Sequence, residues 1–296
     1  FRRVLFRSSN YITILAVLSA VMMVALIIHE LMTKDPVIEL HVFKERSYAV
    51  GVFLMSVVGF VLYGSMVLLP IMLQTLLGYP SMQAGIAMAP RGIGSFLTMP
   101  LIGILTTKVD LRKLLATGLT VGGLTLLWLG QLNLQAGYWD IFWPQFLQGS
   151  GMALLFVPLT TVAMASIPPE RMGNATSLFN LMRNIGGSVG IAMTATILGR
   201  QRQAIGITLG EHVSPLDPAT QSALYQMKAM FMAAGADAVT ATNRAYAAMS
   251  GMLMRQASMV SFVELFRELG ILFLALIPLV LIMRRPKHKA GPMGAH

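Results

Sequence analysis

Long runs of apolar residues, each bounded by charged or turn-forming positions, dominate the chain. No Asp, Glu, Lys or Arg occurs in Ser47–Pro90, Leu114–Trp139 or Ile141–Pro169. A helix needs about 20 predominantly apolar residues to cross a bilayer. Each of the three runs is long enough for a crossing, so the pattern predicts a protein that passes through a membrane several times.

Within these runs the apolar residues are continuous and do not alternate with a period of two. Backbone groups in lipid must bond one another, which restricts spanning segments to helices and closed barrels, and barrel strands alternate. The sequence therefore predicts an all-α, polytopic membrane protein. The borders of the runs give seven spans, near residues 11–29, 49–76, 82–107, 114–132, 141–166, 173–199 and 269–283.

Composition excludes several other classes of protein. The chain is 55% hydrophobic and 11% charged, and its mean hydropathy is +0.69, whereas a soluble domain carries about 25% charged residues. The net charge of +10 does not indicate nucleic acid, because the basic residues flank apolar runs instead of gathering on one face. Cysteine and an HExxH motif are absent, so neither a metal site nor a cofactor is expected.

The connections between spans differ sharply in their basic residues. Lys and Arg in short connections resist translocation and stay in the cytoplasm. The segments 77–81 and 133–139 contain neither. Eleven basic residues lie in the alternate connections and the tail: Lys34, Lys44, Arg46, Lys108, Arg112, Lys113, Arg171, Arg284, Arg285, Lys287 and Lys289. The sequence therefore predicts that these connections and the carboxy terminus are cytoplasmic.

The first residues conflict with this topology. Phe1–Ser8 carries three arginines on the side that an odd number of spans makes external. We expect the chain to be a fragment of a longer protein. Residues 1–8 are then either a non-native or truncated leader or a genuine short loop that follows a preceding helix.

A segment of about 60 residues, 200–261, separates the sixth and seventh spans and is predicted to lie outside. Pro215 and Pro218 indicate a loop at its start. Beyond them, residues 219–258 form either an amphipathic helix on the outer surface or against a partner, or a partly ordered loop. The helical alternative rests on the spacing of Leu224, Met227, Met230 and Phe231.

Two stretches carry glycine, proline and polar residues in a specific order. The first contains Pro70, Gln74, Gly78, Ala84, Gly85, Pro90, Arg91 and Gly92, and the second contains Gly173, Asn180, Arg183, Asn184, Gly186, Gly187 and Gly190. In these positions the chain resembles the 14-helix drug:proton antiporter family of the major facilitator superfamily, the EmrB/QacA type. The resemblance covers residues 35–289.

The resemblance implies a helix bundle of the major facilitator type. It assigns residues 9–47 to the last helix of a central pair and a cytoplasmic linker, 48–289 to the carboxy-terminal six-helix bundle with the external loop 200–261, and 290–296 to a cytoplasmic tail. It implies proton-coupled efflux of amphipathic or cationic drugs by alternating access across the bacterial cytoplasmic (inner) membrane. The implied partners are the lipid bilayer, the amino-terminal half of the same transporter, a periplasmic adaptor and an outer-membrane channel.

Two charged residues, Arg91 and Arg183, lie inside predicted spans. Charged groups at membrane depth usually face the bundle interior or a water-filled cavity, and the helical rise places both near the midplane, where such transporters bind substrate. They line the transport pathway or act as structural arginines that bond helix-end carbonyls. Gln74, Asn180 and Asn184 line the same cavity or form interhelical hydrogen bonds.

The glycines and prolines of the motifs are expected to act mainly in helix packing, kinks and turns. Close helix approach is predicted at two small-residue pairs, Gly118 with Gly122 and Gly186 with Gly190. The full set of motif residues assigned to structure is Pro70, Gly78, Gly85, Pro90, Gly92, Gly186, Gly187 and Gly190.

No Asp or Glu lies in any of the apolar runs, although proton coupling normally uses a titratable group at membrane depth. We therefore expect the coupling carboxylate in the amino-terminal half. No catalytic grouping is visible, so an enzyme is not expected. The remaining alternatives are a transporter of another small molecule and a non-transporting membrane scaffold or sensor.

Overall fold

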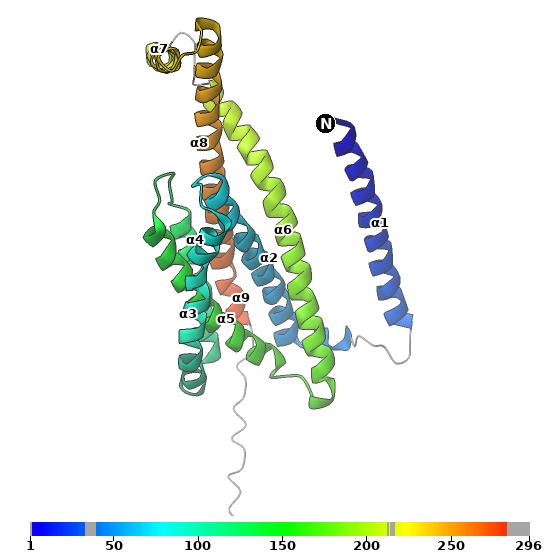
Figure 1. Cartoon of the computed structure of the whole chain (residues 1–296). Coiled ribbons are helices and arrows are strands. Elements are labelled where there is room, and N and C mark those ends of the chain that lie inside the picture. Colours follow the sequence, from blue (N-terminus) through cyan, green and yellow to red (C-terminus); the bar gives the residue numbers. More distant parts are fainter. Residues whose placement is uncertain (1, 33–39, 212, 214–216, 283–296) are drawn as a thin grey trace, which may run out of the picture.

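The computed structural model describes residues 2–32, 40–211, 213 and 217–282, and the regular structure over these residues is entirely helical (Figure 1). This confirms the predicted fold class, an all-α membrane protein. Short 3-10 turns, η1 (Leu40–Lys44) and η2 (Pro169–Arg171), precede two of the helices. The α-helices are α1 (Arg2–Met32), α2 (Arg46–Thr75), α3 (Ser81–Lys108), α4 (Leu111–Leu129), α5 (Tyr138–Met164), α6 (Met172–Glu211), α7 (Pro218–Ala233), α8 (Ala238–Ala275) and α9 (Ile277–Ile282).

Four helical segments of the described chain are long and apolar enough to cross a membrane: α2, α3, α5 and the stretch Ala238–Ile282 that α8 and α9 form. They correspond to the second, third, fifth and seventh predicted spans. The first, fourth and sixth predicted spans are also helices, α1, α4 and α6. In α1 the described residues contain a shorter apolar stretch, Thr13–Met22, whereas α4 and α6 are less apolar over the length of a span. In α4 the reason is Arg112 and Lys113 in its first turn.

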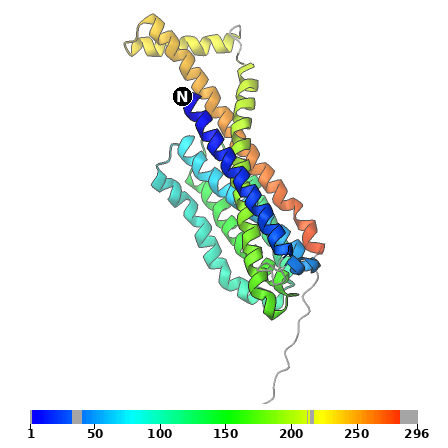
Figure 2. The same cartoon turned by 90° about the vertical axis from the view of Figure 1, so that its right-hand side faces the viewer.

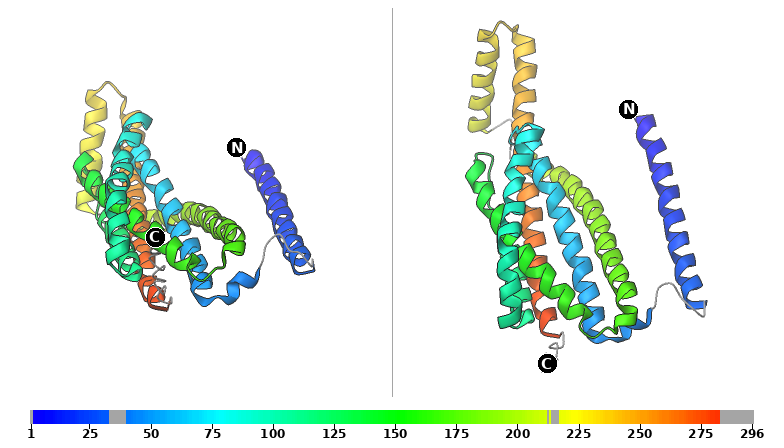
Figure 3. Two further views of the ribbon diagram at one scale, coloured as in Figure 1. Left: turned by 90° about the horizontal axis from the view of Figure 1, so that it is seen from below. Right: turned by 60° about the horizontal axis from the view of Figure 1, so that its bottom comes forward.

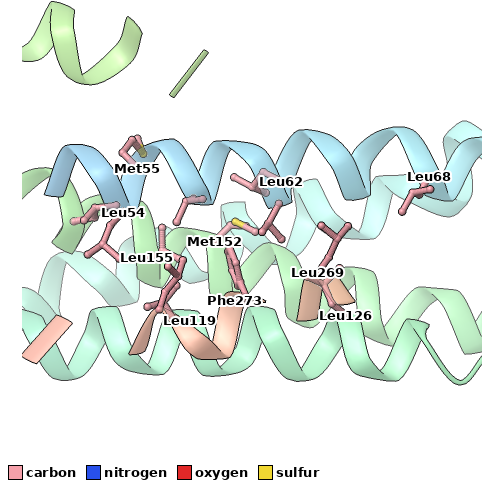
Figure 4. Packing of buried hydrophobic residues seen from close by; sticks show 14 of the residues in the cluster. Leu54, Met55, Leu62, Leu68, Leu119, Leu126, Met152, Leu155, Leu269 and Phe273 are labelled. Atoms are coloured by element: carbon pink, nitrogen blue, oxygen red, sulfur yellow. The ribbon is translucent and has the colours of Figure 1, made fainter. Parts of the chain in front are cut away.

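Helices α2 to α6, α8 and α9 pack into one bundle (Figures 1 and 3). α2 lies along α6, α3 lies along α5, and α4 packs against both α5 and α8. Figure 4 shows Leu62 of α2, Leu119 of α4, Met152 of α5 and Phe273 of α8 converging between the helices. The apolar core draws on these four helices and also on α3, α6 and α9.

Glycine brings α2 and α6 into close contact. A Cβ atom on Gly186 or Gly190 of α6 would overlap the backbone carbonyl of Ser56 or Phe60 of α2. The two helices can lie this close only because both positions lack a side chain. The other predicted glycine pair, Gly118 and Gly122 of α4, contacts two different helices. Gly118 faces the α5 backbone, and Gly122 faces the ring of Phe273 in α8.

The turn after α2 depends on Gly78. Its φ is 71°, in the left-handed region that other residues enter only at a cost. The amide of Tyr79 donates to the carbonyl of Leu73 at 3.0 Å, which ties the turn back to the end of α2. This turn directs the chain into α3, which begins at Ser81.

The segment 200–261, predicted as an external loop, is mostly helical. α6 runs to Glu211, beyond the predicted span end at residue 199, and α8 begins at Ala238, well before the predicted start at 269. The helical alternative for residues 219–258 is confirmed, except that the chain turns at Gly235, whose φ is 91°. The prediction stopped each span at charged residues, but a helix can continue past the lipid because water solvates its polar side chains.

We call residues 200–211 of α6, all of α7 and residues 238–258 of α8 the projection, because they extend beyond the bundle (Figures 1 and 2). Two aspartates cap its helices. The carboxylate of Asp217 accepts from the amides of Ala219 and Thr220, and Asp237 caps α8 in the same way. A hydrogen bond from the Thr220 hydroxyl, followed by the backbone bonds, lowers the pKa of Asp217, and bonds led by Thr240 lower the pKa of Asp237.

Helix α1 stands apart from the bundle (Figure 1), and its described side chains are largely exposed. Ile14, Leu18 and Val21 are apolar side chains that a helix exposes readily to lipid. The predicted leader at residues 1–8 falls within this helix from Arg2 onward. Lys34 of the linker, the four basic residues of the tail and residues 290–296 lie outside the described residues.

Candidate transport cavity

Arg91 and Arg183 line the same cavity. Its volume is about 390 Å³, and its wall comes from α2, α3, α5 and α6. The sequence placed each arginine near the membrane midplane but could not place them together. The other lining residues are Leu62, Tyr63, Met66, Ser95, Met99, Met152, Ala153, Phe156 and Val157.

The position of Arg91 is set by the contact between α3 and α5. A Cβ atom on Gly149 of α5 would overlap the backbone carbonyl of Arg91. One turn further along α3, the Ser95 hydroxyl donates to the Gly149 carbonyl at 2.8 Å. Arg91, Ser95 and Met99 are spaced four residues apart, so they form one stripe of α3 along the cavity.

Arg183 lies where α6 crosses α2. A Cβ atom on Gly59 of α2 would overlap the Arg183 carbonyl and would lie 3.3 Å from its Cγ. The Nε atom of Arg183 is buried and has no hydrogen-bond partner. A buried donor of a charged group that lacks a partner is costly.

Tyr63 connects this cavity with a smaller one. The second cavity, of about 210 Å³, is lined by Tyr63, Gly187, Ser188, Ile191 and Asn184. A Cβ atom on Gly187 would overlap the ring of Tyr63. Asn184 therefore lies beside the cavity of Arg91 and Arg183, separated from it by the tyrosine.

The remaining predicted site residues lie elsewhere. Gln74 is exposed near the end of α2, where its side-chain oxygen accepts from the Ser81 hydroxyl at 3.4 Å. Asn180 lies one turn before Arg183 on α6 but is not among the residues that line either cavity. Pro70 and Pro90 lie inside α2 and α3. A Cβ atom on Gly85 or Gly92 would meet no atom within 4 Å, so these two glycines face open space on α3.

The apolar lining of this cavity was not predicted from the sequence. Met66, Met99, Met152, Tyr63 and Phe156 belong to three helices, and nothing in the sequence indicates which of many methionines and aromatics share a cavity. The four-residue spacing from Arg91 to Ser95 and Met99 is the one local signal that was available.

Two carboxylates lie just before the predicted start of the seventh span at residue 269. Because α8 starts at Ala238, Glu264 and Glu268 belong to the same continuous helix as that span. Glu268 accepts a hydrogen bond from Gln201 at 3.0 Å, and Glu264 lines a different cavity. Neither is among the residues that line the arginine cavity.

Comparison with known proteins agrees with this architecture. A family model described as Major Facilitator Superfamily matches residues 5–191. The chain belongs to the Major Facilitator Superfamily. The resemblance to its EmrB-type members is confirmed by similarity to curated relatives.

Three curated relatives of this chain show how far the similarity extends. The multidrug export protein EmrB of Haemophilus influenzae is 36% identical over 222 residues, 74% of this chain and 43% of the relative. EmrB of Escherichia coli K12 is 31% identical over 97% of this chain and 55% of its own length. The fatty acid resistance protein FarB of Neisseria gonorrhoeae is 32% identical over 98% and 55%. The chain thus spans about half the length of these relatives.

Proposed function

We propose that this chain is the carboxy-terminal half of a proton-coupled multidrug efflux transporter that exports amphipathic compounds by alternating access. The observation that carries the proposal is a single cavity that is lined by Arg91, Arg183 and several methionine and aromatic side chains. The names of the EmrB relatives support drug export over another small-molecule substrate. An amino-terminal half would supply the opposite wall of the pathway.

The lining suits varied apolar ligands. Met66, Met99 and Met152 are flexible and polarizable, so they can repack around ligands of different shape. Tyr63 and Phe156 add flat apolar surface. A volume of about 390 Å³ falls within the range of about 300–1,000 Å³ that is usual for small-molecule sites.

The charge of the cavity favours one kind of polar group. Its lining residues include two guanidinium groups and no carboxylate, so this half attracts an anionic group and repels a cation. Of the amphipathic or cationic compounds that the family resemblance implies, a cation would need acidic groups from the amino-terminal half. FarB is named for resistance to fatty acids, which are carboxylate amphipaths.

Proton coupling is assigned to the amino-terminal half. Neither Glu264 nor Glu268 lines the cavity of Arg91 and Arg183. Glu264 lines a different cavity, and Glu268 accepts a hydrogen bond from Gln201. A carboxylate of the other half that faced Arg183 would have its pKa lowered by the nearby positive charge. Protonation of that carboxylate would then weaken its attraction to the arginine and release the two halves from each other.

Orientation follows from the basic residues. Lys44 and Arg46 lie at the start of α2, Lys108 ends α3, Lys113 is in the first turn of α4, and Arg171 immediately precedes α6. These helix ends share one end of the bundle (Figure 1). We assign this end to the cytoplasm and the protein to the bacterial cytoplasmic membrane. The carboxy terminus is then cytoplasmic and the projection external.

The projection is the candidate docking surface for a periplasmic adaptor that leads to an outer-membrane channel. Tyr225 of α7 and Tyr246 of α8 are 76% and 59% exposed, and exposed aromatics are frequent at interfaces. Deleting residues 219–258 would remove half of α8, so paired Tyr225→Ser and Tyr246→Ser substitutions in the complete transporter are the cleaner test. Undiminished pull-down of the adaptor would contradict this assignment.

Efflux can be tested in cells that lack their own pumps. The complete gene product should lower accumulation of a fluorescent carboxylate amphipath, and Arg183→Gln should restore accumulation while the protein remains in the membrane. Gln74→Ala, outside the cavity, is the matched control and should export normally. If wild-type protein leaves accumulation of carboxylate, neutral and cationic amphipaths unchanged, the proposed function is wrong.

A further inference from the structure

A second large cavity lies at the opposite end of the bundle from the basic connections. Its volume is about 490 Å³, and it lies between the α4–α5 connection and α8. It shares no lining residue with the arginine cavity. Its lining residues are Leu132, Asn133, Leu134, Gln135, Gln256, Met259, Val260, Val263, Glu264 and Arg267.

Tryptophan marks the depth of this cavity in the membrane. All three tryptophans of the protein flank the α4–α5 connection, and Trp128, Trp139 and Trp143 are each at least 45% exposed. Tyr138 stacks edge-on against Trp139. Tryptophan and tyrosine concentrate where the hydrocarbon meets the lipid headgroups. The connection that these tryptophans flank, which forms one side of the cavity, is therefore expected at headgroup level.

Two opposite charges occupy one wall of the cavity. Arg267 donates its Nε proton to the Gly130 carbonyl at 2.8 Å, and a Cβ atom on Gly130 would lie 2.6 Å from the Arg267 Cγ. The arginine is therefore held against the end of α4 by the backbone and not by a carboxylate. Glu264 lies one turn away on α8 and lines the same cavity, so a positive and a negative group are presented side by side.

The remaining lining separates into polar and apolar parts. Asn133, Gln135 and Gln256 are exposed polar residues, whereas Leu132 and Met259 are buried. A ligand that matches this wall carries an anion, a cation and an apolar body. Membrane phospholipids have this construction, and their headgroups lie at the same depth.

From this arrangement we infer that the cavity of Glu264 and Arg267 binds the headgroup of a phospholipid that carries a phosphate and a primary ammonium, as in phosphatidylethanolamine. The guanidinium of Arg267 binds the phosphate, and Glu264 accepts hydrogen bonds from the ammonium. A quaternary ammonium has no proton to donate to Glu264, and a glycerol headgroup has no cation. The site therefore discriminates among headgroups as well as binding lipid.

The test uses the complete transporter, delipidated in detergent and titrated with phosphatidylethanolamine, phosphatidylcholine or phosphatidylglycerol of identical acyl chains. Bound lipid is counted by native mass spectrometry. We expect wild-type protein to bind phosphatidylethanolamine about three- to tenfold more tightly than phosphatidylcholine, as one partly exposed charged hydrogen bond allows. Glu264→Gln should abolish this preference and leave binding of phosphatidylglycerol unchanged.

Glu268→Gln is the matched control, because Glu268 lies one turn further along α8, bonds Gln201 and does not line the cavity. It should keep the wild-type preference. Equal affinity of wild-type protein for the three lipids would overturn the inference, as would a preference that survives Glu264→Gln. Either result leaves the efflux proposal untouched, because the arginine cavity is separate.

Discussion

Arg91 of α3 and Arg183 of α6 belong to helices that are far apart in the chain, yet both line one methionine-rich cavity. α3 reaches the cavity through its contact with α5, and α6 reaches it through its contact with α2. Two positive charges on one apolar wall are unusual inside a membrane bundle. The relationship leads to the first prediction.

Removing the charge of Arg183 should impair transport more than it impairs folding. In the complete transporter we expect Arg183→Gln to lower efflux of a carboxylate amphipath about tenfold or more, since a hydrogen bond to a charged group contributes roughly 1.5–3 kcal/mol. Arg183→Lys should recover part of the loss because it keeps the charge. Initial efflux rates and membrane levels of the protein measure the two effects. Equal rates for Arg183→Gln and wild-type protein would rule out a role in the pathway.

Glycines at the helix crossings should be intolerant of alanine, whereas those on the open face of α3 should not. Gly149→Ala and Gly186→Ala place a methyl group into a neighbouring backbone, and we expect a loss of about 1–3 kcal/mol. Gly85→Ala meets no atom and should change stability by no more than about 1 kcal/mol, in the stabilising direction. Thermal unfolding of the detergent-solubilised transporter, followed by size-exclusion fluorescence, makes the comparison. Equal melting temperatures for Gly149→Ala and Gly85→Ala would contradict the packing described for α3 and α5.

A buried glutamine pair in α5 should behave as a unit. Gln145 and Gln148 are 2% and 1% exposed, and they bond each other at 3.3 Å, while the Gln145 Oε1 and Gln148 Nε2 atoms have no partner. Replacing either one with methionine leaves the other unpaired, which should cost about 1–3 kcal/mol. Replacing both should cost less than the sum of the single changes. Additive losses in this double-mutant cycle would show that the pair is not coupled.

Acid should weaken the N-terminal caps of α7 and α8 in the projection. The depressed pKa values of Asp217 and Asp237 mean that their caps are fully present above the usual aspartate pKa of 3.8 and are lost as the pH falls through the lower folded-state values. We therefore expect faster amide exchange in the first turns of α7 and α8 at pH 3 than at pH 6, after correction for intrinsic rates. Asp217→Asn and Asp237→Asn keep a capping oxygen without titrating, so their exchange should not depend on pH in this way. A pH-independent wild-type pattern would argue against the caps.

Much of the fold was predictable because a helix that crosses lipid needs a continuous apolar stretch, which can be read along the sequence. Uninterrupted apolar runs located α2, α3 and α5 to within a few residues of their observed bounds. The same rule failed for α6 and α8, because it ends a span at the first charged residues, here Arg200 and Glu268, and cannot see a helix continue into water. Of the predicted polar site residues, Arg91 and Arg183 line one cavity, Asn184 lines a neighbouring one, and Gln74 lies at a helix end.

The sequence by itself determined that this protein crosses a membrane as helices, which helix ends carry the basic residues, and that two arginines, Arg91 and Arg183, lie inside long helices. Those properties depend on the transfer of single residues between water and lipid, so they are local. Only the tertiary structure decided that α3 and α6 bring two arginines to one cavity and that α8 sets Glu264 and Arg267 beside the α4–α5 connection. Which helices touch depends on where glycines on both partners allow close approach, and that is a property of pairs of surfaces.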